Sequence, residues 1–180
     1  MNLHVALLTL ALLSACGGSS PKLALAAPTA YTAVAGIPNA SSMGRLILAG
    51  QPTEEQVAAL GEAGVETMID MCRPEERPNR DEAAEAEAAG IVYKHLPLSG
   101  ADALTDAYMD HIRSELRAAE NGLTVLHCRS ANRVGAVMIP YLVLDQGRGL
   151  EQAIAEAKQI GLRSAALEAK AVAYTKAQQE

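Results

Sequence analysis

A cysteine and an arginine lie close together where a strand-like segment is followed by a helix-like one. Residues 124–137 read TVLHCRSANRVGAV, an apolar run that stops at His127 and Cys128, and Arg133 opens a helical stretch. Backbone N–H groups converge at the N-terminus of a helix and form an anion site there. The same field favours a thiolate: a fall in thiol pKa from about 8.5 to about 6 raises its ionised fraction at pH 7 from about 3% to about 90%. The planar guanidinium of Arg133 suits an oxyanion. The pattern therefore predicts a thiolate that attacks phosphorus or sulfur in a bound oxyanion.

The elements that must position these residues alternate along the chain. Strands are predicted at residues 45–50, 65–72, 91–98 and 123–128. Helices are predicted at residues 53–64, 81–90, 104–122, 133–146, 150–160 and 164–180. Such alternation predicts a single α/β domain with a mostly parallel sheet of four to five strands, flanked by helices. Ligands of these sheets bind beyond the carboxyl ends of the strands, so three loops should meet there: residues 71–80, 98–104 and 128–133.

The junction resembles the signature loop of a known superfamily. VLHCRSANRVGA, at residues 125–136, is similar to the loop of cysteine-dependent phosphatases. More closely, it resembles bacterial phosphatase-like proteins of the beta-lactamase-hydrolase-like phosphatase group, which are related to tyrosine and dual-specificity phosphatases. LAGQPTEEQVAALGEAGVETMIDMCRPEE, HLPLSGADALT and ALEAKAV extend the resemblance over most of residues 46–172. The resemblance implies a phosphatase-like α/β fold in which Cys128 is the nucleophile and Arg133 a phosphate ligand.

The loop departs from the superfamily's pattern in three ways. Four residues separate Cys128 from Arg133, where tyrosine and dual-specificity phosphatases have five and rhodanese-like sulfurtransferases also have four. Ala131 stands where glycine is usual, and a positive φ there would cost an alanine about 1–2 kcal/mol. Val134 replaces a serine or threonine that helps the thiolate leave, so that Ser130 is left to supply a hydroxyl.

Other residues are expected to bind the substrate or to assist the reaction. Substrate binding is assigned to the loop and the histidine before it: His127, Arg129, Ser130, Ala131 and Asn132. His127 either orients the loop through a ring hydrogen bond or is an ordinary core histidine. The leaving oxygen needs a general acid, for which Asp102 is the first candidate and Asp106 the second. The alternative for Asp102 is a solvated turn residue. The alternative for Asp106 is an acidic residue that the helix dipole favours in the first turn of a helix.

Several charged residues and a second cysteine have two interpretations each. Arg73, Arg77 and Arg80 either select anionic substrates or form a solvated cluster with the neighbouring Glu75 and Glu76. The acidic segment DEAAEAEA is expected to be an exposed helix face. Besides Cys128, a folded domain from residue 41 onward contains only one other cysteine, at position 72. It is either a buried thiol or the partner of Cys128 in a reversible disulfide.

Two further functions remain open, namely rhodanese-like sulfur transfer through a Cys128 persulfide and noncatalytic binding of an anion or partner. No cofactor and no metal site are predicted, because the four histidines are scattered and no Cys or His pair has ligand spacing. The net charge of -6 argues against nucleic-acid binding. The expected substrate is a phosphorylated protein or small molecule.

The first residues carry a targeting pattern. Residues 5–13 form an apolar run too short to span a bilayer, and LSAC follows at residues 13–16. LSAC resembles a bacterial lipobox, which implies a signal peptide at 1–15, a lipidated Cys16 with a flexible tether at 16–40, and a domain at 41–180. The expected location is the bacterial cell envelope, with a lipid anchor on the periplasmic side of the outer membrane. Ordinary secretion, with cleavage after Ala26, and an untargeted chain are the alternatives.

Overall fold

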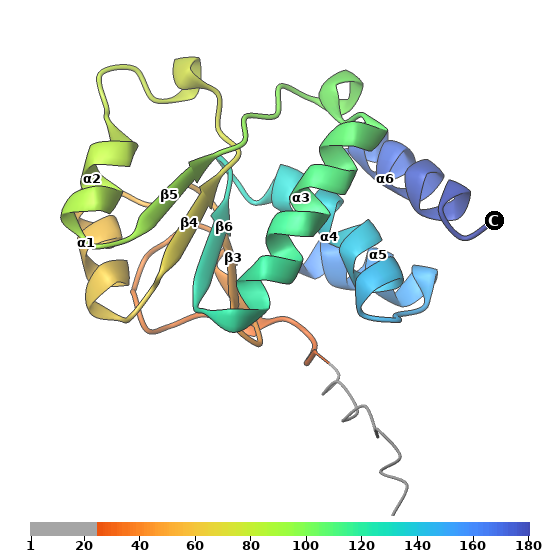
Figure 1. Cartoon of the computed structure of the whole chain (residues 1–180), viewed down its shortest axis with the longest axis horizontal. Coiled ribbons are helices and arrows are strands. Elements are labelled where there is room, and N and C mark those ends of the chain that lie inside the picture. The colour runs from red at the N-terminus through yellow and green to blue at the C-terminus, as the bar shows by residue number, and fades with distance from the viewer. Residues whose placement is uncertain (1–24) are drawn as a thin grey trace, which may run out of the picture.

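The structure, a computed structural model, describes residues 25–180 (Figure 1). Six strands form one sheet in the order β1-β2-β3-β6-β4-β5. The four strands predicted from the sequence are its parallel part: β3 (Leu46–Ala49), β6 (Thr124–His127), β4 (Thr67–Asp70) and β5 (Val92–His95). The predicted signal peptide and the lipidation site at Cys16 lie outside the described residues.

The sheet has more strands than predicted because the domain begins before residue 41. β1 (Thr29–Ala30) and β2 (Ser41–Met43) extend the sheet beside β3, and both pairings are antiparallel. Between them, Val34 and Ile37 are buried in the same hydrophobic cluster as Ile47 of β3. The composition of residues 28–40 resembles a tether, yet two apolar side chains and a strand attach this segment to the domain. The boundary predicted at residue 41 is therefore too late.

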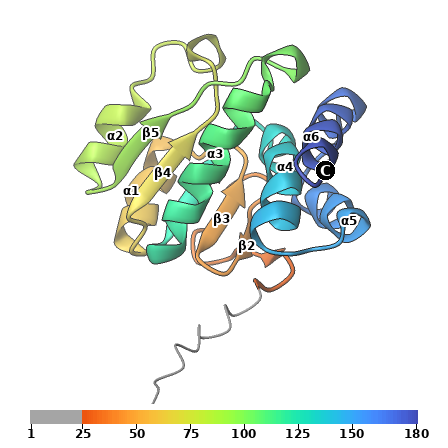
Figure 2. The ribbon, with the colours of Figure 1, turned by 45° about the vertical axis from the view of Figure 1, so that its right-hand side comes forward.

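Helices cover both faces of the sheet (Figures 1 and 2). One face packs against α1 (Glu54–Glu62) and α2 (Glu82–Ala88). The other packs against α3 (Asp106–Ala118), α4 (Asn132–Pro140), α5 (Leu150–Ile160) and α6 (Ala165–Ala177). In β6 the consecutive residues Val125 and Leu126 belong to the two different clusters, as the alternation of side chains along a strand requires. The predicted α/β domain with a mostly parallel, helix-flanked sheet is confirmed.

The helix boundaries follow their capping residues. Thr53 caps α1, and its side chain and that of Gln56 exchange hydrogen bonds with each other's backbone N–H groups at 3.3 and 2.9 Å.

The helix predicted at 133–146 is continuous but changes its winding. Pro140 has no N–H to donate to the preceding turn, and the turn after it, η4 (Tyr141–Asp145), is π-helical. Within residues 25–180, no helix combines the length and apolar character needed to cross a bilayer.

Candidate active site

The three predicted loops meet at the carboxyl ends of the parallel strands. Cys128 directly follows β6, and its backbone N–H donates to Ala49 at the end of β3 at 3.3 Å. Arg133, in the first turn of α4, reaches back across the other two loops. Its Nη1 donates to the carbonyl of Met71 at 3.0 Å and to that of Leu98 at 2.7 Å. The arginine of the signature loop therefore joins the segments that follow β4, β5 and β6.

Glu76 sets the orientation of the arginine. It ends the short 3-10 helix η1 (Pro74–Glu76), and its two carboxylate oxygens accept from Nη1 and Nη2 of Arg133, both at 2.8 Å. Such a bidentate pair fixes the plane of the guanidinium. Burial lowers the pKa of Arg133, but the hydrogen bonds to Glu76 and the nearby Cys128 raise it, and the net direction is upward. Sequence reasoning placed Glu76 in a solvated cluster and missed this role, because nothing local links it to residue 133.

Hydrogen bonds from neighbouring segments hold the loop between Cys128 and Arg133 in place. The Asn132 side-chain oxygen accepts from the backbone N–H groups of Arg163 at 2.7 Å and Ser164 at 3.0 Å, between α5 and α6. The carbonyl of Ser130 accepts from the side chains of Arg163 at 3.2 Å and Asn39 at 3.3 Å. Arg129 is exposed. Of the predicted substrate-binding residues, Asn132 thus uses its side-chain oxygen to hold the loop in place.

Ala131 has a left-handed backbone conformation, at the position where glycine is usual. It is fully buried at the N-cap of α4, with φ 61° and ψ 0°. For an alanine this conformation costs about 1–2 kcal/mol. The loop therefore keeps a backbone geometry suited to glycine without a glycine.

We expect Ala131→Gly to leave stability nearly unchanged. Relief of about 1–2 kcal/mol of left-handed strain offsets about 0.5–1 kcal/mol of backbone entropy and about 0.8 kcal/mol for the lost methyl. The matched control is Ala136→Gly, an equally buried position with helical backbone in α4. It should lose about 2 kcal/mol. Urea unfolding of both variants measures the difference, and equal losses would contradict strain at Ala131.

His127 makes no loop-orienting ring hydrogen bond among the described residues, although that was one of its two interpretations. Its side chain is fully buried on β6, and among the described residues neither ring nitrogen has a hydrogen-bond partner. Nε2 lies 3.7 Å from Asp70 Oδ1 and 3.4 Å from Glu82 Oε2. The ring faces these two carboxylates behind the loop.

The two candidate acids lie on the loop after β5 and at the start of the next helix. Asp102 is exposed in the short 3-10 helix η2 (Ala101–Ala103), on the loop whose Leu98 contacts Arg133. Asp106 is exposed in the first turn of α3, which Thr105 caps. Both remain predictions as general acids.

The arginines after β4 are paired rather than free for substrate. Arg73 pairs with Glu76 at 3.4 Å, as predicted, whereas the other two arginines have partners that were not predicted. Arg77 donates to the buried carboxylates of Asp70 and Glu82, and Arg80 pairs with Glu85. The acidic helix α2 is therefore not simply an exposed face, since Glu82 is only 1% exposed. Its carboxylate tolerates burial because two arginines of the preceding loop contact it.

Cys72 and Cys128 are both free thiols, and both are buried. Burial and, after it, the adjacent Asp70 raise the pKa of Cys72 above the ordinary thiol range. Because the thiolate is the reactive form, Cys72 is a poor nucleophile in this setting. A reversible disulfide between the two cysteines remains a prediction.

The solved structures with this fold include phosphatases. P. aeruginosa TpbA has a TM-score of 0.66 and 25% identity, over 84% of this chain and 89% of that chain. The TpbA cysteine-to-serine variant in complex with phosphotyrosine has a TM-score of 0.65 and 24% identity, over 83% and 88%. Kinase-associated phosphatase, with its catalytic-site cysteine replaced by serine, has a TM-score of 0.64 and 16% identity, over 74% and 87%. A scan of family models and a search of curated proteins gave no match.

The chain therefore has the α/β fold of the tyrosine and dual-specificity phosphatases. Among these structural relatives, kinase-associated phosphatase has a catalytic-site cysteine.

Proposed function

We propose that this protein is a cysteine-dependent phosphatase that hydrolyses a phosphate monoester through a phosphocysteine intermediate. The observation that carries the proposal is the position of Arg133, which Glu76 and two loop carbonyls fix in the loop that begins at Cys128. An arginine held in this way at a helix N-terminus is a preorganised site for a phosphoryl group. The Nε of Arg133 has no acceptor among the described residues and is free to donate to a phosphoryl oxygen.

The residues support a two-step reaction. The Cys128 thiolate attacks phosphorus, so that the S–P bond forms while the P–O bond to the leaving group breaks. Asp102 donates its proton to the leaving oxygen. Water then attacks phosphorus and gives a proton to the Asp102 carboxylate, the S–P bond breaks, and inorganic phosphate and the thiolate are released. Arg133 and the loop amides stabilise the charge on the phosphoryl oxygens in both steps.

The assignment of Asp102 gives a specific expectation. Asp102→Asn should lower kcat for an alkyl phosphate by about 10²-fold and remove the alkaline limb of its pH profile, because the amide cannot donate the proton. Asp106→Asn is the matched control on the neighbouring helix turn and should leave both unchanged. The pH dependence of kcat for the two variants decides which aspartate is the general acid. If only Asp106→Asn loses the alkaline limb of the pH profile, Asp106 is the general acid instead of Asp102.

The four-residue spacing between Cys128 and Arg133 favours sulfur transfer as the second candidate. Two assays on the same preparation separate the candidates. Hydrolysis of an aryl phosphate under reducing conditions supports the phosphatase. Transfer of sulfur from thiosulfate to cyanide without phosphate release would overturn it. Binding of inorganic phosphate with neither turnover would leave a noncatalytic anion-binding module.

The proposal also includes a phosphorylated substrate and a lipid-anchored location. The complex of the TpbA variant with phosphotyrosine supports a phosphorylated substrate for this chain as well. The lipobox-like LSAC supports a lipid anchor on Cys16 in the bacterial cell envelope. Incorporation of labelled palmitate that persists in Cys16→Ser would contradict the anchor.

A further inference from the structure

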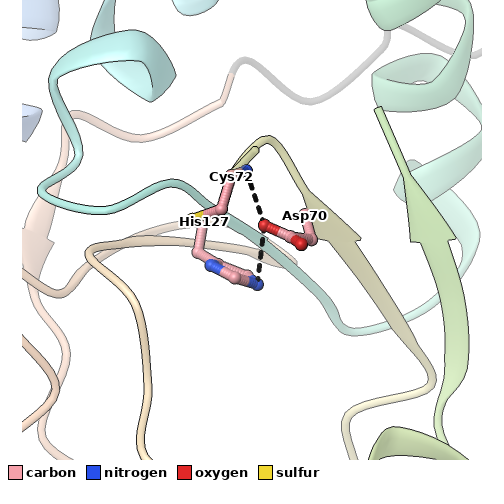
Figure 3. Close-up of side chains that lie close together, drawn as sticks. All are labelled: Asp70, Cys72 and His127. Atoms are coloured by element: carbon pink, nitrogen blue, oxygen red, sulfur yellow. Dashed lines mark hydrogen bonds and ion pairs between the residues drawn. The ribbon is translucent and has the colours of Figure 1, made fainter. Parts of the chain in front are cut away.

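A second cluster of reactive side chains lies behind the candidate active site. Asp70 ends β4, Cys72 follows two residues later, and His127 ends β6 (Figure 3). The two strands are adjacent and parallel, with Asp70 opposite His127. All three side chains are buried, and a carboxylate oxygen, the Sγ and a ring nitrogen lie within 4.8 Å of one another. The sheet thus gathers oxygen, sulfur and nitrogen donors that are far apart in the sequence.

His127 has polar atoms with no hydrogen bond. Its imidazole is 0% exposed, and within residues 25–180 neither nitrogen has a hydrogen-bond partner. Burial of such a group without a partner is unfavourable. Nε2 is directed at Asp70 Oδ1, 3.7 Å away, and lies 3.4 Å from Glu82 Oε2 (Figure 3). A tetrahedral zinc ion with bonds of about 2.0–2.2 Å holds nitrogen and oxygen donors about 3.4 Å apart. The 3.7 Å between Nε2 and Asp70 Oδ1 is close to that separation.

The charges of the cluster also suit a divalent cation. Asp70 and Glu82 contribute two carboxylates, and Arg77 contacts both of them. Cation binding breaks the S–H bond of Cys72, forms a metal–sulfur bond and releases one proton to solvent. Arg80 also contacts Glu82 but pairs with Glu85, so these last two charges cancel. The three anions, the Arg77 guanidinium and a divalent cation then sum to zero. A mixed sulfur, nitrogen and oxygen donor set favours zinc over magnesium or calcium.

We infer that Asp70, Cys72 and His127 provide three ligands of a Zn²⁺ site. The inference does not depend on the proposed phosphatase activity. A zinc ion there holds the residue immediately before Cys128, and it also removes the Cys72 thiol from reaction with oxidants or with Cys128. The site therefore lies next to the loop without being part of it.

The test is a cobalt titration of the metal-free full chain carrying Cys16→Ser, in which Cys72 and Cys128 are the only thiols. We expect one Co²⁺ per chain, with the visible bands of tetrahedral Co²⁺ and a thiolate-to-cobalt charge-transfer band in the near ultraviolet. One equivalent of Zn²⁺ should displace it. Cys72→Ser should lose the charge-transfer band. Cys128→Ser, which replaces a buried cysteine next to the same strands, should retain it.

Two results would overturn the site: absence of stoichiometric tetrahedral cobalt, or loss of the charge-transfer band in Cys128→Ser but not in Cys72→Ser. Because Cys72→Ser could fail to fold, X-ray absorption of the zinc-loaded chain without that substitution provides an independent measurement. We expect one sulfur scatterer at about 2.3 Å together with nitrogen or oxygen scatterers. A zinc shell without sulfur contradicts the inference.

Discussion

Cys128→Ser is expected to lower the turnover of an aryl phosphate by about 10⁴-fold or more. The serine hydroxyl occupies nearly the same volume at the end of β6, but it is not ionised near neutral pH. The phosphoryl group can still bind to the loop amides and to Arg133, whereas the S–P bond cannot form. Hydrolysis should be measured under reducing conditions for the wild-type chain and the variant, over a full range of substrate concentration.

Two controls separate a chemical defect from a folding defect in Cys128→Ser. The side chain is 1% exposed, so urea unfolding must show that the variant stays folded under assay conditions. Inorganic phosphate should inhibit the wild type and bind the variant with similar affinity, because the anion site is kept. Turnover within tenfold of the wild type would identify another nucleophile and end the phosphocysteine mechanism.

Arg133→Lys is expected to lower kcat/KM by about 10²–10³-fold. One guanidinium donates to both oxygens of Glu76 and to the carbonyls of Met71 and Leu98. A single ammonium cannot make these contacts and also donate to a phosphoryl oxygen. The substitution keeps the positive charge, so the loss reports geometry rather than charge. Steady-state kinetics should show kcat falling together with kcat/KM, because the lost contact stabilises the transition state.

Glu76→Gln is the companion variant for Arg133→Lys. It leaves the guanidinium in place and replaces the bidentate charged pair with a weaker neutral contact, so we expect a smaller loss, about tenfold. Equal activity of Arg133→Lys and the wild type would show that Arg133 does not contact the phosphoryl group. A larger loss in Glu76→Gln than in Arg133→Lys would instead assign a direct role in the reaction to the carboxylate.

The parts of this molecule that depend on local pattern could be predicted from the sequence. The four parallel strands are short apolar runs, and Thr53 with Gln56 marks the start of α1. The glycine usual at the position of Ala131 raised the question of a positive φ, and the left-handed backbone is present there. These features depend on side-chain periodicity, capping and backbone sterics within a few residues, which an amino-acid sequence shows directly.

Features that depend on partners distant in the chain were missed or wrongly predicted. The segment before residue 41 belongs to the sheet because Thr29 and Ala30 pair with residues 41 and 42, which its composition does not reveal. Glu82 was expected in solvent but is buried, because Arg77 and Arg80 contact it from the preceding loop. In each case a nonlocal contact outweighs the local tendency of the residue.

The sequence by itself determined the single α/β domain and the location of the cysteine and arginine at a strand–helix junction. The tertiary structure alone decided what holds the arginine and what surrounds His127. Glu76 reaches Arg133, and Asp70 and Cys72 reach His127, only because β4 and β6 are neighbours in the sheet. Sequence spacing carries information along one strand or helix, whereas the order of strands is set by the burial of both sheet faces. That burial is a property of the whole chain.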